Sequence, residues 1–285
     1  MRWRQRRRGD CRAMSAWVDL HLHSCRSDGA ETPERLVERA AAAGATAIAL
    51  TDHDTVAGVA DAQQAATKAG MGFLTGVEIS AAFDGREIHV VGLGLDAHND
   101  ALQKLLGELA RMRRERMRAI HKRLRTLGIP ADETRGKEEG NGLGRMHVAV
   151  ALRDMGKADT VQGAFERYLN RGRPAYVPKE LPNIKLAVEA IHTARGLAFI
   201  AHPGLGHWIM KRLDALLALP FDGLEAWHPS HTHAVTRQIM AVAESRRLLL
   251  SGGSDCHGNV KNEGLLLGRI KTPAEYYHHI LDALL

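Results

Sequence analysis

The sequence predicts an α/β fold, a parallel sheet or barrel that is interrupted by a mainly helical insertion. From Trp17 onward, short β-forming runs alternate with helical stretches, which is typical of βα units. Histidine and acidic residues recur at the ends of these runs, where the loops of a barrel converge. The alternation stops at about residue 99 and resumes after residue 181, which indicates an insertion.

Seven segments have the apolar and β-branched character of buried strands. They are residues 17–21, 46–51, 72–79, 87–94, 197–202, 222–227 and 248–253. Helices separate them; the helix predicted at 33–43 follows Thr32, a suitable N-cap, and has Pro33 in its first turn. The Asp84-Gly85 pair predicts a hairpin turn before the fourth strand.

The insertion has a different pattern from the rest of the chain. A long amphipathic helix comes first, and a glycine-rich loop and two shorter helices follow it. The loop contains Gly136, Gly140, Gly142 and Gly144. We therefore divide the chain into a basic head at 1–16 that we expect to be disordered, a barrel domain at 17–98 and 182–285, and an inserted helical subdomain at 99–181.

The basic character of the chain is concentrated in its head. The net charge is +6, and the first 13 residues hold six Arg and one Asp, so that removing them lowers the net charge to +1. We interpret Met14 as an alternative start site. No apolar run is long enough to span a membrane, no secretory signal is evident, and the three cysteines form no CxxC pair. We expect a cytoplasmic protein.

The candidate functional residues lie at or just after the ends of the predicted strands, apart from His89, which lies within the fourth strand. Two histidines, two residues apart at the end of the first strand, point to the same side of the backbone. In a βα barrel, the other strand ends bring residues that are distant in sequence to the same mouth. The candidates are His21, His23, His53, Glu78, His89, His202, Asp255 and His257. A lone histidine in a strand is more often structural, but so many at successive strand ends predict a metal centre. Nitrogen and carboxylate ligands without thiolate favour manganese, with magnesium, iron and zinc as alternatives.

The ordered motifs DLHLHSCRSDG, ALTDHD, GVEIS, IHVVGL, AHPG and SDCHG resemble those of the PHP (polymerase and histidinol phosphatase) family. The resemblance covers residues 17–100 and 184–260. It implies a distorted (β/α)7 barrel with two or three divalent metal ions. One ion would be held by His21, His23, Glu78 and Asp255, a second by Glu78, His89 and His202, and a third by Asp28, His53 and His257. Some relatives have histidine where this chain has Asp28.

Within this family, the segments FERYLNRGRPAYVP and EAWHPSHT are similar to the branch of 3′,5′-nucleoside bisphosphate phosphatases. That resemblance implies hydrolysis of the 3′-phosphate of nucleoside 3′,5′-bisphosphates, such as conversion of pAp to AMP. It also implies 5′-3′ exoribonuclease activity on short 5′-phosphorylated RNA. A metal-bridging hydroxide would attack phosphorus without a protein nucleophile. We expect no obligate protein partner.

A substrate with two phosphates requires a second anion site. Arg145, Arg171 and Arg173 in the insertion are candidates, because guanidinium groups bind phosphate oxygens bidentately. Tyr176 and Lys179 are weaker ones. Each arginine could equally be a surface residue. His228 could contact phosphate or protonate the leaving group, or it could be structural.

Three other interpretations remain open at this point. A histidinol-phosphate phosphatase would share the metals and the barrel but would require a pocket for an ammonium and an imidazole group. A non-catalytic metal-binding accessory module would be expected to have lost ligands, whereas every expected ligand position is filled here. A nucleic-acid-binding protein organised around the head would bind with a steep salt dependence, lost on deletion of residues 1–13.

Overall fold

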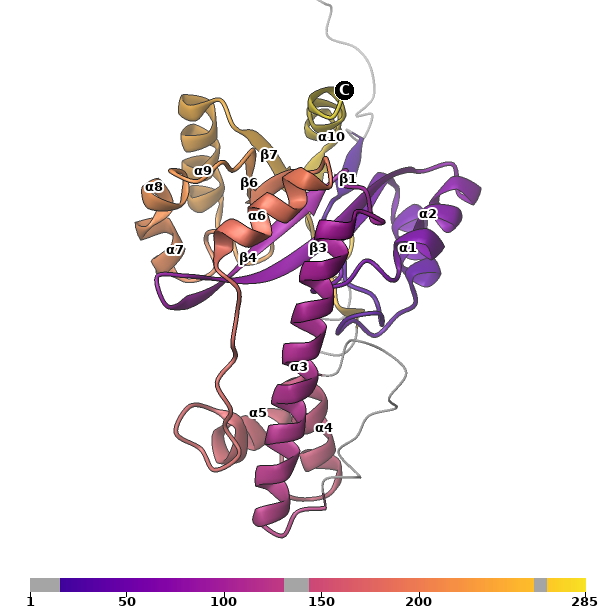
Figure 1. Cartoon of the computed structure of the whole chain (residues 1–285). Coiled ribbons are helices and arrows are strands. Elements are labelled where there is room, and N and C mark those ends of the chain that lie inside the picture. Colours follow the sequence, from indigo (N-terminus) through magenta and orange to yellow (C-terminus); the bar gives the residue numbers. More distant parts are fainter. Residues whose placement is uncertain (1–15, 131–143, 259–265) are drawn as a thin grey trace, which may run out of the picture.

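The computed structural model describes residues 16–130, 144–258 and 266–285 of the chain. The predicted basic head, the alternative start at Met14 and most of the glycine-rich loop lie outside the described residues. Within them, a mixed sheet is flanked by helices, and a long helix leads from it to a smaller group of helices (Figure 1).

In the described part of the chain, the sheet has eight strands in the order β7-β6-β5-β4-β3-β2-β1-β8. Their bounds are β1 Trp17–Asp19, β2 Ala45–Leu50, β3 Gly72–Phe83, β4 Arg86–Leu93, β5 Leu197–Ile200, β6 Gly223–Trp227, β7 Leu249–Gly252 and β8 Thr272–Pro273. The pairs β1–β2, β2–β3, β5–β6 and β6–β7 are parallel. All seven predicted strands are therefore present, and the short β8 is an addition.

Hydrogen bonds between the two ends of the sheet bring it close to a closed barrel. Immediately after β1, the amide of Leu20 donates to the carbonyl of Gly252 at 3.0 Å, and the amide of His23 donates to that of Cys256 at 3.1 Å. In return, the amide of Asp255 donates to the carbonyl of His21 at 2.9 Å. The result is the distorted α/β barrel that the sequence predicts.

The strand β4 departs from the expected parallel arrangement. It pairs antiparallel with both β3 and β5. The cause is the tight turn at Asp84 and Gly85, where both residues have positive φ (49° and 72°), as a two-residue hairpin turn requires. The hairpin prediction is confirmed, and because the hairpin extends the ladder, β3 runs to Phe83 rather than ending at residue 79.

Helices cover the outside of the barrel (Figure 1). The first, α1 (Pro33–Ala43), begins as predicted, with the Thr32 side chain accepting the amide of Arg35. The others on the outside are α2 Val59–Lys68, α6 Ile184–Thr193, α7 His207–Lys211, α8 Leu213–Leu216 and α9 His233–Arg246. The last helix, α10 Ala274–Ala283, packs Ile280 against the opposite face of the strands, with Val18, Ala49 and Phe199. Across the described ranges, no helix has the length and apolar character needed to cross a membrane.

The helix α3 (Asp100–Thr126) connects the barrel to the smaller helices α4 (Arg145–Asp154), α5 (Val161–Ala164) and η2 (Phe165–Leu169) (Figure 1). Its first half contributes Leu102, Leu105, Leu106 and Leu109 to the barrel's apolar core. Its second half contributes Met117, Ile120 and Leu124 to a separate core with α4, α5 and η2. The first half of α3 therefore packs against the barrel and its second half against the small helices, so that this one continuous helix sets the position of the small helices relative to the barrel.

Candidate metal centre

Two histidines and two carboxylates form the most tightly grouped part of the site. His21 and His23 follow β1 on the same side of the chain, and their Nε2 atoms are 3.1 Å apart. His21 Nε2 lies 3.3 Å from Glu78 Oε2 and 3.5 Å from Asp255 Oδ1. His23 Nε2 lies 3.2 Å and 3.0 Å from the same two oxygens. Ligand atoms about 2.1 Å from one ion lie roughly 3.0–3.5 Å from one another, so this spacing suits a shared ion.

Glu78, on β3, connects this group to a second one. Its Oε1 lies 2.9 Å from His89 Nδ1 on β4 and 2.9 Å from His202 Nε2 after β5. Its Oε2 lies 2.9 Å from His53 Nδ1. His53, Glu78 and His89 offer ligand atoms that all lie within 4.8 Å of one another. This set contains His53 where the resemblance implied His202, although His202 also reaches Glu78.

A third group is formed by His23, Asp28, His53 and His257, again with ligand atoms within 4.8 Å. His257 Nε2 lies 3.1 Å from Asp28 Oδ1, and His53 Nε2 lies 3.9 Å from the same oxygen. The rings of His23 and His257 stack with centroids 4.2 Å apart. All nine residues predicted as ligands therefore belong to one connected cluster of side chains.

The backbone makes this convergence possible. His202 and Asp255 adopt positive φ angles (29° and 49°), which are uncommon for residues other than glycine and cost on the order of 1–3 kcal/mol each. A Cβ at Gly253 would lie 2.4 Å from the amide nitrogen of His21. Because Gly253 lacks a side chain, the chain after β7 can approach β1 and present Asp255 to the two histidines.

Partners behind the histidines determine which ring nitrogen faces the centre. Glu225 Oε1, on β6, lies 2.8 Å from His21 Nδ1, and Glu87 Oε1 lies 3.3 Å from His89 Nε2. His257 Nδ1 is 2.8 Å from the carbonyl oxygen of Asp255. In each case, the nitrogen that donates to the partner leaves the other one available as a ligand.

Glu225 and Glu87 were not among the predicted site residues, because among acidic residues of the strands only those at the carboxyl ends were considered. A signal was present for Glu225, the acidic residue within the otherwise apolar strand Gly223–Trp227. A fully buried carboxylate must have a partner, because an unpaired buried charge is costly. Its second oxygen accepts the amide of His202 at 2.6 Å.

The electrostatics of the described residues fit bound cations. Burial alone would raise the pKa of Glu78, but His53, His89 and His21 outweigh it and hold that pKa well below its usual range. Ligand-type atoms around it are buried and make no hydrogen bond within the described part of the chain: His53 Nδ1, Glu78 Oε2, His89 Nδ1, Asp28 Oδ1 and His257 Nε2. Buried polar atoms are normally satisfied, so these residues fit divalent metal ions as their missing partners.

His228 lies beside this cluster at the end of β6. The amide of Ser230 donates to its Nδ1 at 3.1 Å, so the proton of the neutral ring belongs on Nε2. That nitrogen lies 3.3 Å from Asp255 Oδ2. His228 is therefore a buried hydrogen-bond donor that faces the metal-binding residues.

A cavity of about 270 Å³ opens from the cluster toward the insertion. His53, His89 and Asp28 line one side of it, and residues of α3, α4 and η2 line the other. Among the predicted substrate residues, Arg145 and the weaker candidate Lys179 line this cavity. Arg171 and Arg173 are exposed and do not belong to its lining.

Comparison with known proteins adds independent information. A model of the PHP domain matches residues 19–170. Over 249 residues, the chain is 38% identical to a 5′-3′ exoribonuclease of Haemophilus influenzae, covering 86% of this chain and 91% of that protein. It is 36% identical over 247 residues to a 3′,5′-nucleoside bisphosphate phosphatase of Chromobacterium violaceum, covering 84% and 87%. A crystal structure from Bifidobacterium adolescentis, assigned as a metal-dependent phosphoesterase, matches with a TM-score of 0.83 at 31% identity, covering 94% of this chain and 96% of that one.

Proposed function

The chain belongs to the PHP domain family, and from this premise we propose that it hydrolyses the 3′-phosphate of nucleoside 3′,5′-bisphosphates and degrades short 5′-phosphorylated RNA from the 5′ end. The observation that carries the proposal is that the metal-binding cluster and the cavity have three residues in common. His53, His89 and Asp28 belong both to the metal-binding cluster and to the lining of the cavity that contains Arg145. A phosphoester could therefore contact the cluster while a second anionic group extends toward the insertion.

We propose as metal ligands the nine predicted residues: His21, His23, Asp28, His53, Glu78, His89, His202, Asp255 and His257. Imidazole and carboxylate donors support manganese as the resident ion, with magnesium, iron and zinc as alternatives. Bound divalent ions would neutralise phosphoryl oxygens and lower the pKa of water enough for hydrolysis near neutral pH.

The residues around the cluster would orient the substrate and supply a proton. His228, with Nε2–H directed toward Asp255, would donate to the departing ribose oxygen or to a phosphoryl oxygen. Asp255 would keep that ring oriented before the substrate binds. Arg145, at the start of α4, would contact an anionic group at the far side of the cavity.

One chemistry accounts for both activities. In a nucleoside 3′,5′-bisphosphate, the scissile phosphate is on the 3′ oxygen and the 5′ phosphate is the distal anion. In 5′-phosphorylated RNA, the same 3′ phosphate carries the rest of the chain. The arrangement of scissile phosphate, sugar and distal phosphate is therefore common to both substrates.

The test is product analysis with metal-depleted protein reconstituted with Mn²⁺. We expect adenosine 3′,5′-bisphosphate to yield 5′-AMP and inorganic phosphate, and a 5′-phosphorylated oligoribonucleotide to be shortened from its 5′ end. Histidinol phosphate, assayed in parallel, is expected to be a poor substrate. Turnover of histidinol phosphate alone would favour that rival activity, and no turnover of any of the three would favour the accessory module.

A further inference from the structure

A surface at the rim of the metal-binding cluster has no role in the proposed function as stated above. It lies at the tip of the β3–β4 hairpin and on the neighbouring parts of α6, α7 and α8. Two of its side chains are half-buried aromatic rings, and the other three are exposed cations. This hairpin surface consists of Phe83, Arg86, Lys185, Trp208 and Arg212.

Two short segments connect the hairpin surface to the metal-binding residues. On β4, Arg86 comes three residues before His89, a distance of roughly 10 Å at the rise of a strand. After β5, the amide of Leu205, just before α7, donates to the carbonyl of His202 at 2.8 Å. Because His89 and His202 both reach Glu78, the surface begins next to the cluster.

The hairpin surface is separate from the cavity that adjoins the insertion. Arg86 does not belong to the lining of that cavity, and neither does His202. From His202, the rings of His228 and His231 follow at centroid distances of 5.1 and 5.3 Å. His231 Nε2 in turn accepts the amide of Gly204 at 3.0 Å. The segment before α7 is therefore held against the part of the cluster that the cavity does not include.

The side chains of the hairpin surface suit the bases of a nucleic acid. The Arg86 guanidinium lies over the ring of Trp208, 5.3 Å from its centroid. The ring of Phe83 lies next to that of Trp208, with the two centroids 6.3 Å apart. Proteins that bind single-stranded RNA stack its bases on aromatic rings and on arginine guanidinium groups.

A groove of about 360 Å³ continues the surface beyond Phe83. Its apolar lining consists of Phe83, Ile184, Ala215 and Leu219. Lys185 and Arg212 also line it, and among the residues that the structure describes no carboxylate lies within ion-pair distance of Lys185. Arg212 pairs with Asp84 at 3.2 Å, but both side chains are more than half exposed, so the pair contributes little free energy and is exchanged easily. An apolar groove bordered by cations fits a base and its phosphate.

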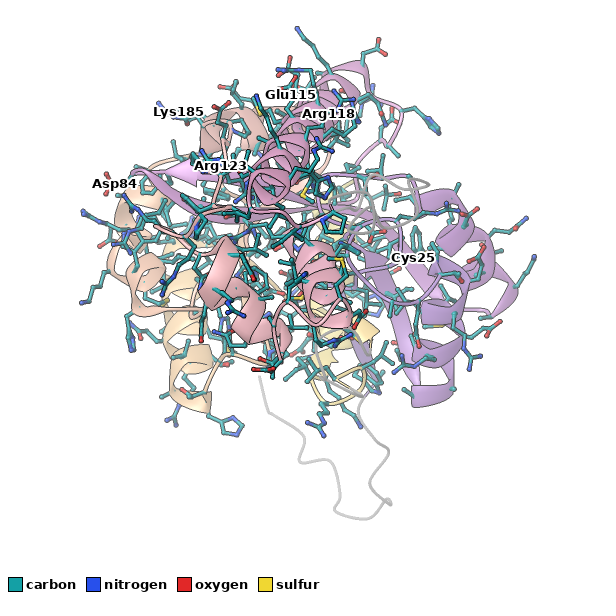
Figure 2. All side chains as sticks on the ribbon, turned by 90° about the horizontal axis from the view of Figure 1, so that it is seen from below. Cys25, Asp84, Glu115, Arg118, Arg123 and Lys185 are labelled. Carbon is teal, nitrogen blue, oxygen red and sulfur yellow. The ribbon has the colours of Figure 1, made fainter. Side chains whose placement is uncertain are left out.

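The rim on the other side of the barrel has a different character. Arg26, after β1, pairs with Asp61 at 3.0 Å, and Arg39 on α1 pairs with Glu31 at 2.6 Å. Figure 2 shows Cys25, from the segment after β1, on the opposite side of the molecule from Asp84 and Lys185. Because their charges are already compensated, these two arginines attract a polyanion less than the hairpin surface does.

We propose that the hairpin surface binds single-stranded RNA on the 3′ side of the scissile phosphate. In the proposed function, the first nucleotide occupies the cavity and its 3′ phosphate lies at the cluster. That phosphate carries the rest of the RNA, which must leave the cluster outside the cavity. The inference rests on the proposed function and deepens it, because RNA would reach this surface whereas a nucleoside bisphosphate ends at the scissile phosphate.

The test compares Arg86→Gln, Lys185→Gln and Trp208→Leu with the control Lys68→Gln. Lys68 is exposed on α2, on the other side of the barrel from α7 (Figure 1). With Mn²⁺-loaded protein and a 5′-phosphorylated pentaribonucleotide, KM should rise about 5- to 50-fold for Trp208→Leu, which removes a stacking surface. For each charge variant, the slope of log KM against log salt should become shallower by about 0.7, the effect of losing one phosphate contact on a single strand.

Adenosine 3′,5′-bisphosphate provides the internal comparison, because it has no nucleotide beyond the scissile phosphate. Its kcat/KM should change by less than about twofold in all four variants. Equal losses on the two substrates would mean that the variants disturb the cluster or the fold, and would overturn the surface. An unchanged KM for the pentaribonucleotide in the three surface variants would overturn it too.

Two further outcomes have a definite meaning. If sedimentation shows that the wild type dimerises and Trp208→Leu does not, the surface belongs to a second copy of this chain and the assignment to RNA fails. If Trp208→Leu does not fold, as judged by thermal unfolding, Arg86→Gln and Lys185→Gln decide by their salt dependence.

A binding measurement separates this inference from the proposed function. If the Mn²⁺-loaded wild type hydrolyses no RNA, the proposed function fails, and fluorescence anisotropy with the same pentaribonucleotide, labelled at its 3′ end, decides the surface. Binding that is about fivefold or more weaker in the three surface variants, and unchanged in Lys68→Gln, would support it. Equal affinity in all of these proteins, or no binding by the wild type, would overturn it.

Discussion

Glu225 Oε1 lies 2.8 Å from Nδ1 of His21, and both side chains are buried almost completely. Because His21 donates from Nδ1 to this carboxylate, its Nε2 is directed at Glu78 and Asp255. The other oxygen of Glu225 accepts the amide of His202. One carboxylate behind the metal-binding cluster therefore orients the ring of His21 and holds the backbone of His202.

Replacing Glu225 with Gln is expected to weaken metal binding by about 10- to 100-fold, the usual effect of losing such a supporting group. The amide keeps the size of the side chain but not the charge that favours the proton on His21 Nδ1. Competition with a metal chelator would measure the affinity. Glu244→Gln, at an exposed position on α9, is the matched control and should leave the affinity unchanged. Wild-type affinity in Glu225→Gln would show that the contact is only structural.

Replacing His228 with Gln is expected to lower kcat by about 10²- to 10⁴-fold on a nucleotide substrate while the bound metal stays the same. The loss should be much smaller with p-nitrophenyl phosphate, whose leaving group departs without a proton. Steady-state kinetics with metal analysis of the same samples would check both points. A similar loss on the two substrates would argue against proton donation and for a phosphate contact.

Replacing Arg171 and Arg173 together with Ala is expected to change KM for adenosine 3′,5′-bisphosphate by less than about twofold. Both are exposed and neither lines the cavity, and exposed charges contribute little to binding at a distance. Initial-rate kinetics beside Arg145→Gln would make the comparison. A large increase in KM would restore them as substrate residues, as the sequence alone predicted.

The metal-free protein is expected to lose stability as the pH rises from about 6.5 to about 10. Burial lowers the pKa of His23, but Asp255 and Glu78 outweigh it and raise that pKa to about 9. Burial also lowers the pKa of His89, but Glu78 and Glu87 outweigh it and raise that pKa to about 10. A histidine whose pKa is raised in the folded state stabilises the folded protein at pH values below the unfolded-state pKa of about 6.5. This contribution to stability is lost as the pH rises through the folded-state pKa.

Thermal unfolding of chelator-treated protein across this range would measure the effect. Saturating Mn²⁺ should remove most of the dependence, because ligand histidines bind metal in their neutral form. A variant with Gln at position 89 should show a smaller decline than the wild type. A metal-free protein whose stability does not fall above pH 6.5 would contradict the prediction.

The seven principal strands, the hairpin turn, the barrel and the phosphoesterase family were all predictable, because each depends on local patterns or on ordered motifs. The strand β8 was not, since Thr272 and Pro273 are too short a segment to show any periodicity. The Asp84-Gly85 turn, which was predicted, makes β4 antiparallel to β3. The expectation of a parallel sheet did not take this into account. The roles of the ligand residues and the boundaries of the insertion stay predictions.

The sequence by itself determined which residue types meet at the strand ends, because the period of a strand and the convergence of a barrel bring His21, His23 and Asp255 together in any chain with this order of elements. Only the tertiary structure decided what surrounds them. That Arg145 lines the cavity and Arg173 does not depends on how α3 packs between two cores and positions the small helices. The pairing of Glu225 with His21 depends on contacts across 204 residues of chain. Such contacts leave no periodic signal, because they are set by the closure of the barrel rather than by local backbone preference.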